Sequence, residues 1–187
     1  MSVCIVSFSS RKNGNCGQIA AYLQSLYEDA KLYDFADFSI HPCGDCVYEC
    51  FSRGGRCPFM EDREYELYEA ILGSAQTYYI IPNYCDYPCA NFFIFNERSQ
   101  CFFQGHPKRV EAYCRIPKKF IVVSNTNEQN FRDILAYHVE DEPDILFLHA
   151  RKYGKVSIAG DLMTSGEAVA QLEAFAGESP PAVGTSS

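Results

Sequence analysis

The stretch VCIVSF, Val3 to Phe8, decides the fold together with the loop and the amphipathic segment that follow it. The apolar run has the length of a buried strand, and the loop Ser9 to Asn15 is rich in serine, asparagine and glycine. From Asn15 to Tyr27 the apolar residues recur at helical spacing. We therefore predict a buried strand, a polar loop and a helix, in this order.

The same alternation continues to about residue 176. Further strands are predicted at Lys31–Ile40, Gln76–Pro82, Lys119–Ser124 and Asp144–His149. Further helices are predicted at Glu61–Leu72, at Pro88–Phe103, from the polar loop Asn125-Thr126-Asn127 to about Val139, and at Ser165–Ala176. Apolar strands that alternate with helices indicate a parallel sheet covered on both faces. We expect one α/β domain over residues 1–176 with a five-stranded parallel sheet, and a flexible C-terminal tail, rich in Gly, Pro, Ser and Ala, over residues 177–187.

The composition excludes several classes of partner. The 187-residue chain has 16 Lys and Arg against 24 Asp and Glu, a formal net charge of −8 and a pI near 5.0. General binding to nucleic acid or to an anionic membrane needs a basic surface, and neither is expected here. No segment approaches the roughly 18 uninterrupted apolar residues of a membrane span. Because no basic n-region precedes the first apolar run, we expect a cytoplasmic protein whose ten cysteines are not disulfide-bonded.

The loop between the first strand and the first helix carries the strongest chemical signal. It reads SFSSRKNGNC over Ser7 to Cys16 and places hydroxyls, an arginine and amides where a helix N-terminus points its free N–H groups. Such a loop holds a phosphate without a basic surface. It matches neither GxxxxGK[ST] nor GxGxxG, which disfavours a nucleoside triphosphate or a Rossmann dinucleotide. The structural alternative is an N-capped turn, because serine and asparagine favour such positions.

Five stretches, in order, resemble one family, the NADPH-dependent FMN reductase group of flavodoxin-like proteins. The loop resembles the family's G-S-P-R-K-N-G-N-T fingerprint. Two stretches are similar to its cysteine loops, namely Pro42-Cys43-Gly44-Asp45-Cys46, and Gly55-Arg56-Cys57-Pro58 before the acidic pair Glu61-Asp62. The last two are Pro82-Asn83-Tyr84 with Ala90, Phe95 and Arg98, similar to its flavin-facing loop and helix, and Arg151 to Lys155 through Gly160-Asp161-Leu162. The resemblance covers about residues 1–176.

This resemblance implies a flavodoxin-like three-layer sandwich and an FMN-dependent oxidoreductase. NAD(P)H would pass a hydride to the flavin, and a small molecule or a redox protein would accept the electrons. By the same resemblance, Ser9, Arg11, Asn13, Asn15 and Cys16 would surround the FMN phosphate, Pro82, Asn83, Tyr84, Cys85 and Asp86 would flank the isoalloxazine ring, and Ser124, Asn125 and Thr126 would close the third side. No side chain is assigned as a catalytic acid or base, and we expect a homodimer.

The chain departs from the family pattern at three places. Phe8 stands for a glycine, Cys16 for a threonine, and Cys85-Asp86-Tyr87 for the usual Trp-Gly-Ser. A bulky, acidic loop at the last place would narrow the flavin slot, and its carboxylate would disfavour an anionic reduced flavin. A flavodoxin-like binding module without flavin is therefore the alternative from a different class of function.

A second constellation is Cys43-x2-Cys46-x3-Cys50-x6-Cys57. Four thiolates at this spacing suit a [4Fe–4S] cluster or a zinc ion. The pattern is similar to the compact motif of iron–sulfur flavoproteins, which implies an electron carrier with FMN and a cluster. Those proteins tend to have a two-residue middle gap, whereas this chain has three residues there. We expect unliganded thiols, and a fold that does not depend on metal at these positions.

Overall fold

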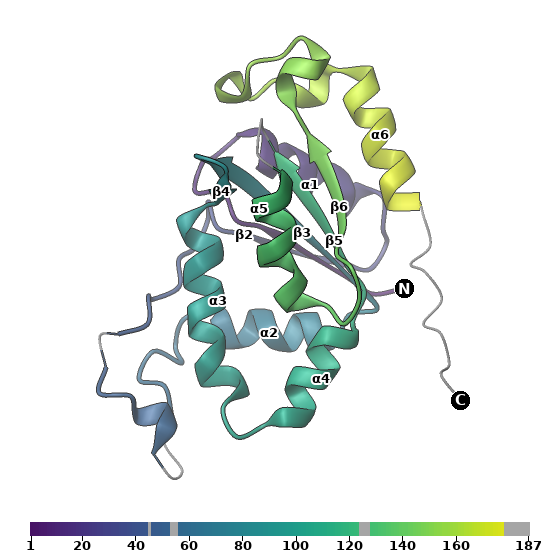
Figure 1. The fold of residues 1–187 in the computed structure, drawn as a ribbon. Helices are drawn as coiled ribbons and strands as arrows, with labels where there is room; N and C mark the ends of the chain where they lie inside the picture. Colours follow the sequence, from purple (N-terminus) through teal and green to yellow (C-terminus); the bar gives the residue numbers. More distant parts are fainter. Residues whose placement is uncertain (45, 53–55, 124–127, 178–187) are drawn as a thin grey trace.

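The computed structural model describes residues 1–44, 46–52, 56–123 and 128–177, and it has a parallel sheet at its centre. The five parallel strands are β1 (Val3–Ser7), β2 (Ala30–Asp34), β3 (Gln76–Tyr84), β5 (Lys118–Val123) and β6 (Asp144–Leu148). Their order in the sheet is β2-β1-β3-β5-β6 (Figure 1). This arrangement confirms the predicted five-stranded parallel sheet. A short sixth strand, β4 (Tyr87–Pro88), pairs antiparallel with the end of β3.

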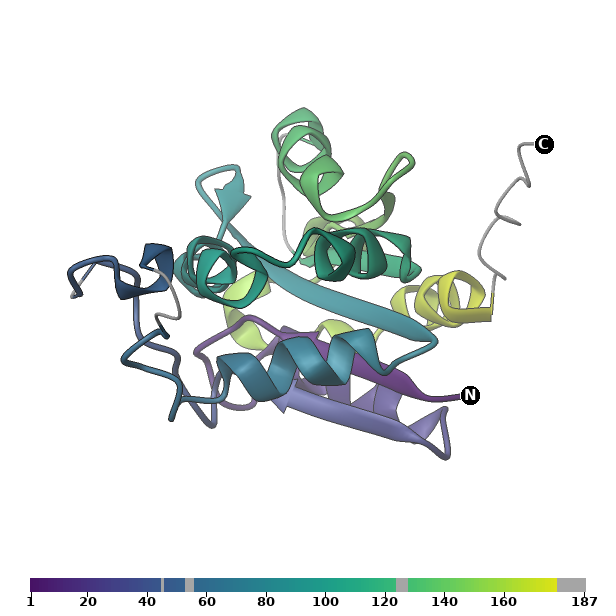
Figure 2. The ribbon, with the colours of Figure 1, turned by 90° about the horizontal axis from the view of Figure 1, so that it is seen from below.

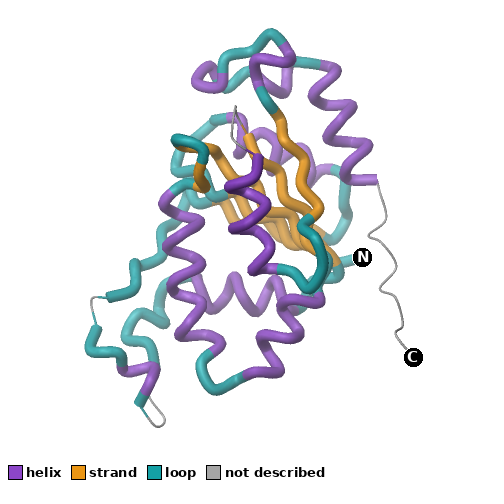
Figure 3. The backbone as a smooth tube through the Cα atoms, viewed as in Figure 1, coloured by secondary structure: helices purple, strands orange, loops and turns teal. Residues whose placement is uncertain are grey.

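Helices cover both faces of the sheet and complete three layers (Figure 3). One face packs against α1 (Asn15–Ser25) and α6 (Gly166–Gly177), whereas the other packs against α2 (Glu64–Leu72), α3 (Ala90–Phe103), α4 (Pro107–Arg115) and α5 (Glu128–Leu135). Helices α2, α3 and α4 contact one another and form the lower part of Figure 1, which is the foreground of Figure 2. Short 3₁₀ turns are η1 (Glu49–Phe51), η2 (Ala136–His138), η3 (Ala150–Tyr153), η4 (Ser157–Ala159) and η5 (Leu162–Thr164).

The two faces of the sheet differ because successive residues of a strand point to opposite sides. On the face of α2 to α5, Tyr79 and Phe120 join a core of Phe and Tyr rings. On the face of α1 and α6, Ile80 and Ile121 join a mostly aliphatic core. Both clusters are closed to solvent, and a sheet buried on both faces explains why its strands are continuous apolar runs in the sequence.

The second strand is shorter than predicted. It ends at Asp34 rather than Ile40, because an Asp34 side-chain oxygen, Oδ1, accepts the N–H of Ala36 (3.1 Å) and its carbonyl accepts that of Asp37 (2.9 Å). This turn is typical of aspartate, whose side chain bonds to the backbone two residues on. Phe35 still enters the aromatic core, so the apolar residues after Asp34 mark a packed turn rather than a strand.

Strand β4 and helix α4 were not predicted from the sequence. Pro88 lies in β4, so α3 begins at Ala90 instead of Pro88. Helix α4 has Pro107 in its first turn, where a missing N–H costs nothing. Only Tyr113 of α4 is buried, and the sequence of this nine-residue helix, PKRVEAYCR, is mostly polar, so no apolar segment marks it. In the described part of the chain, no helix is long and apolar enough to cross a membrane.

Candidate functional site

The candidate site lies at the carboxyl edge of the sheet, at the upper end of the strands in Figure 1. Strands β1 and β3 are neighbours, but the chain leaves β1 toward β2 on one side and returns to β3 on the other. The strand order therefore reverses between them, and open α/β sheets bind ligands at such a point. The loop after β1 and the hairpin after β3 both lie here. Ser124, Asn125 and Thr126 follow β5 directly and lie outside the described residues.

The loop after β1 leads into the N-terminus of α1 and offers backbone donors to an anion. Ser9 is buried, and its Oγ accepts the N–H of Arg11 (3.2 Å). Asn13 has a left-handed backbone (φ 57°), which lets the chain turn sharply before Gly14 caps the helix. The first amides of α1, at Asn15 to Gly17, have no acceptor within the helix, and they point out of its positive end. These donors suit a phosphate group.

Phe8 does not obstruct this loop. Its ring is fully buried in the aromatic core, with ring centroids 5.2 Å from both Phe35 and Phe92. The residue that stands for the family's glycine therefore packs under the loop, and it leaves the loop's open side free. The departure at Phe8 gives no support to a protein that has lost its flavin.

Sequence reasoning missed Asn91, which fixes the loop to α3. The Asn91 amide donates to the carbonyl of Phe8 (2.9 Å) and to Oγ of Ser10 (2.8 Å). The Cys89 thiol also donates to the Phe8 carbonyl (3.2 Å). The only signal in the sequence is a polar residue in the first turn of a helix otherwise rich in phenylalanine, and nothing there specifies its partner.

A C-terminal segment, residues 156–162, lies against the other side of the loop and is called the strap below. The Arg11 guanidinium donates to the carbonyl of Ile158 (2.5 Å), and the Asn15 amide donates to that of Ser157 (3.0 Å). Oδ1 of Asn15 accepts the N–H of Leu162 (3.0 Å). Gly160 belongs to the same contact, because a Cβ atom on it would come within 3.3 Å of the Asn13 carbonyl. The resemblance singled out this C-terminal stretch, and the structure brings it beside the loop.

The predicted phosphate residues thus play different parts. Ser9 and Asn13 shape the turn, while Arg11 and Asn15 use their side chains to hold the strap. The Cys16 side chain points into the aliphatic core, where burial raises the pKa of its thiol. At this edge, Cys16 therefore offers its backbone amide rather than its sulfur.

The hairpin after β3 carries the residues expected beside a ring. Asn83 pairs with Pro88 and Tyr84 with Tyr87, so Cys85 and Asp86 form a two-residue turn. Both turn residues have positive φ (53° and 65°), which is the type I′ geometry that suits a β-hairpin. The Tyr84 and Tyr87 side chains are half exposed (59% and 50%). Two partly exposed aromatic rings therefore lie at the same edge of the sheet as the loop after β1. Pro82, in contrast, is buried inside β3 opposite Val123.

Arg98, which the resemblance placed on the flavin-facing helix, is fully buried away from the hairpin. One of its nitrogens donates to the carbonyl of His41 (2.6 Å) and to Asp62 (2.9 Å), and the other pairs with Glu64 (2.9 Å). Burial raises the pKa of Glu64 to about 8, although the Arg98 charge opposes that shift. Arg98 thus closes the neck of a loop over residues 41–63, called the cysteine loop below.

The four motif cysteines belong to this loop. Cys43, Cys46 and Cys50 are half-buried and Cys57 is buried. Burial and the thiols of Cys57 and Cys50 raise the pKa of Cys101, a residue of α3 that the motif does not include. Among the described residues, no three His, Cys, Asp or Glu side chains are grouped so as to hold a metal ion. The geometry of the described thiols therefore gives no support to a cluster or zinc site.

Comparison with known proteins supports the architecture. No family model and no curated protein matches the sequence. Solved structures do match: the Trp repressor binding protein from Bacillus subtilis superposes with a TM-score of 0.64 at 16% identity, over 93% of this chain and 99% of that one.

Two flavoenzymes match less closely. An NADH:FMN oxidoreductase, EmoB in its apo form, has a TM-score of 0.53 at 13% identity, over 96% and 91% of the two chains. FerB, an NAD(P)H:(acceptor) oxidoreductase from Paracoccus denitrificans, has a TM-score of 0.52 at 15% identity, over 94% of both chains. At these identities the comparison establishes the fold alone. The strand order, the three layers and the superpositions together show that the chain has the flavodoxin-like α/β fold.

Proposed function

We propose that this chain is an FMN-dependent oxidoreductase that takes electrons from NAD(P)H and passes them to a small molecule or a redox protein. The observation that carries the proposal is the meeting of two features at one point. The N-terminus of α1, with its serine-rich loop, lies at the same edge of the sheet as a hairpin with two exposed tyrosines. In the flavodoxin-like strand order, FMN binds at this switch point between β1 and β3.

The described residues fit an FMN molecule at its two ends. The first amides of α1, the hydroxyls of Ser9 and Ser10, and Arg11 would hold the phosphate. The rings of Tyr84 and Tyr87 offer flat apolar faces to the isoalloxazine system. Asn83, Cys85 and Asp86, with Ser124 to Thr126, complete the proposed set. When bound, the flavin supplies the redox chemistry, and the protein binds and orients it.

Two structural neighbours agree with this assignment, since EmoB is an NADH:FMN oxidoreductase and FerB is a flavoenzyme NAD(P)H:(acceptor) oxidoreductase. Arg11 has a further part in it. Its hydrogen bond to Ile158 holds the guanidinium beside the loop, and a guanidinium has five N–H donors, so the others remain available to a phosphate. The strap therefore orients Arg11, the cation of the proposed phosphate site.

The test is a comparison of FMN with riboflavin, which lacks the phosphate. We expect the full-length chain to quench FMN fluorescence saturably and to bind FMN at least tenfold more tightly than riboflavin, a difference of about 1.4 kcal/mol. With FMN bound, NADH or NADPH should bleach the flavin absorbance under anaerobic conditions. Equal affinity for the two flavins would remove the phosphate site from the proposal. No binding of either flavin would establish the flavin-less module instead.

A further inference from the structure

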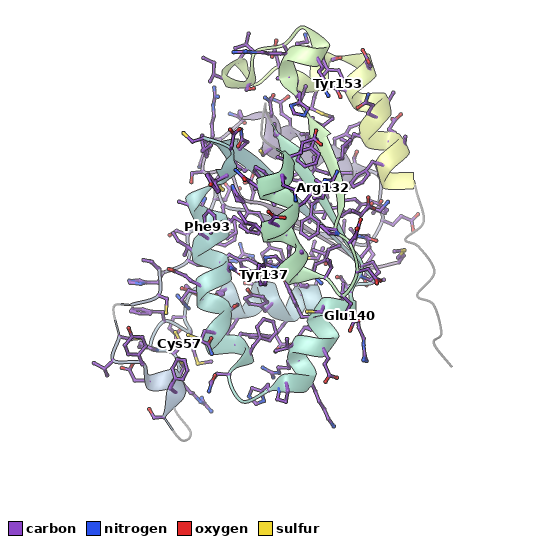
Figure 4. All side chains as sticks on the ribbon, in the orientation of Figure 1. Cys57, Phe93, Arg132, Tyr137, Glu140 and Tyr153 are labelled. Atoms are coloured by element: carbon purple, nitrogen blue, oxygen red, sulfur yellow. The ribbon has the colours of Figure 1, made fainter. Side chains whose placement is uncertain are left out.

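A cavity lies at the amino edge of the sheet, where the parallel strands begin. Its volume is about 190 Å³. The starts of β3, β5 and β6, the end of α4 and the loop after η2 line it with Gln76, residues 114–119, residues 139–142 and Asp144. Figure 4 labels Glu140, one of these residues, beside α4 at the lower end of the strands. Strand β5 runs from Lys118 to Val123, so at about 3.3 Å per residue roughly 17 Å separate the cavity from the proposed flavin site.

The polar group of the cavity wall that indicates a ligand is the amide of Gln76. This residue is 3% exposed, and its Nε2 donates to the carbonyls of Thr77 (3.1 Å) and Pro117 (3.0 Å). Two carbonyl acceptors fix the orientation of the amide, because only its nitrogen can donate to them. Among the described residues, no group donates to the other end of the amide, Oε1. An enclosed acceptor without a partner is costly, so the site favours a ligand that supplies a donor.

Much of the cavity wall is apolar and leaves room for one small ring. Ile116, Pro117 and Val139 contribute aliphatic carbon, and Cys114 contributes a half-buried thiol. A cavity of about 150 Å³ with apolar walls holds one benzene molecule. The larger volume here suits a six-membered ring with a short side chain. Apolar walls with a few placed polar groups are typical of small-molecule sites.

The basic residues of the cavity wall are already engaged by the protein. The Lys118 and Lys119 ammonium groups donate to backbone carbonyls at the ends of α4 and α6. Lys119 also lies 3.9 Å from a carboxylate oxygen of Asp144. Arg115 donates through Nε to Glu140 (3.3 Å). These contacts offset the positive charges of the wall.

Two carboxylates remain at the rim, those of Asp141 and Glu142. Both residues are exposed and line the cavity, and within the described part of the chain neither forms an ion pair. Together with Oε1 of Gln76, they offer a ligand oxygen acceptors, two of which belong to negatively charged groups. A ligand that matches these groups has N–H donors and a positive charge on an apolar body.

We propose that this cavity binds a small arylalkylamine. The ring fills the apolar interior, and the ammonium group donates to Oε1 of Gln76 while Asp141 and Glu142 attract its charge. The amine binds apart from the flavin site and leaves FMN in place. It also stabilises the fold, because a ligand that binds only the folded chain raises the free energy of unfolding.

The experiment titrates the full-length protein with phenethylamine in a calorimeter, with and without FMN. We expect saturable binding with a dissociation constant of about 1 mM or tighter, the same in both cases. Two matched probes test the ligand chemistry. The neutral 2-phenylethanol should bind about threefold more weakly, and the anionic 3-phenylpropionate should not bind. No binding of the amine, or equal binding of the carboxylate, would overturn the proposal.

Substitutions then locate the site. Val139→Phe fills the cavity and should abolish binding of phenethylamine, while Gln76→Met removes the acceptor and should weaken binding about tenfold. The double variant Asp141→Asn with Glu142→Gln should weaken it about threefold. The control Glu111→Gln, at an exposed carboxylate of α4 outside the cavity wall, should leave the affinity unchanged.

Thermal melts followed by circular dichroism show which variants fold, and Val139→Phe carries the test if Gln76→Met does not. Wild-type affinity in either variant would overturn the proposal, because the amine would then bind elsewhere. None of these readouts depends on FMN, so failure here is distinct from failure of the proposed function.

Discussion

The two edges of the sheet use their polar groups in opposite ways. At the carboxyl edge, helix-terminal amides and hydroxyls face outward, and three residues, Asn13, Cys85 and Asp86, have positive φ. At the amino edge, two consecutive lysines at the start of β5, Lys118 and Lys119, are almost completely buried (4% and 2% exposed). One edge keeps donors available, whereas the other commits its charges to the fold.

The buried lysines each close the C-terminus of a helix. The Lys118 ammonium donates to the carbonyls of Tyr113 and Ile116, where α4 ends, and it lies over the Tyr113 ring. The Lys119 ammonium donates to the carbonyl of Phe175, near the end of α6. Successive residues of β5 point to opposite faces, so one helix on each side of the sheet is closed by a cation. A cation at this end of a helix is favourable, because the last carbonyls carry partial negative charge.

The difference teaches where this fold can change without losing stability. The amino edge is fixed by charge-assisted bonds from Lys118 and Lys119 to backbone carbonyls. The carboxyl edge is fixed by Phe8 and Asn91 beneath the loop and by the bonds of Arg11 and Asn15 to the strap, while the first amides of α1 have no acceptor within the helix. Substitutions at the two edges should therefore separate stability from ligand binding.

The largest effect is expected at the amino edge. Lys118→Met keeps the apolar stem but removes the donor to the Tyr113 and Ile116 carbonyls, and hydrogen bonds to charged groups contribute roughly 1.5–3 kcal/mol each. We expect the free energy of unfolding to fall by roughly 2–3 kcal/mol in urea titrations, with FMN affinity unchanged. The control Lys108→Met, at an exposed position of α4, should change the free energy of unfolding by less than about 0.5 kcal/mol. Equal losses in both variants would show that the buried cap contributes nothing special.

The converse effect is expected at the carboxyl edge. Arg11→Ala removes the guanidinium held by Ile158 and should weaken FMN by about 1.5 kcal/mol, a little over tenfold, with stability almost unchanged. Lys12→Ala removes the same charge from the next residue, whose ammonium pairs only loosely with Asp37 (3.7 Å) on the surface. It should leave FMN affinity within about twofold, since exposed ion pairs contribute little. Equal weakening in the two variants, by fluorescence titration, would reduce the role of Arg11 to net charge.

The pH dependence gives a smaller effect at the amino edge. Burial lowers the pKa of Lys118 to about 8, from an ordinary value of 10.5. Between these values the unfolded chain keeps the proton that the folded chain has lost, so the contribution of Lys118 to stability rises with pH. The deficit of Lys118→Met relative to the wild type should therefore grow by about 1 kcal/mol from pH 7 to pH 9. A deficit that is constant over this interval would mean that Lys118 stays protonated in the folded protein.

The sequence predicted the architecture well because the strands of a doubly covered sheet are continuous apolar runs. It also located the loop over Ser9 to Asn15 at the carboxyl edge. It could not predict the strap, because the bond between Arg11 and Ile158 joins residues 147 positions apart through a backbone carbonyl, which any residue type supplies. Cys101 was missed for a related reason. It shares no spacing with the cysteine motif, and only the folded chain lets the Cys57 thiol raise the pKa of Cys101 on α3.

The smallest effect tests whether the strained turn of the hairpin costs stability. Cys85 and Asp86 hold positive φ values that asparagine and glycine adopt more readily in a type I′ turn. The double variant Cys85→Asn with Asp86→Gly should therefore stabilise the fold by about 0.5 kcal/mol, which raises the melting temperature by about 1–2 °C. A control at a residue with ordinary φ on the same hairpin, Tyr87→Phe, keeps the ring and should leave the melting temperature within about 1 °C. If the Asn-Gly turn gains stability and loses FMN affinity, the native turn residues take part in binding, and the carboxyl edge retains strain for its ligand. If both quantities stay at their wild-type values, the positive φ values cost nothing and the contrast between the two edges reduces to the buried lysines.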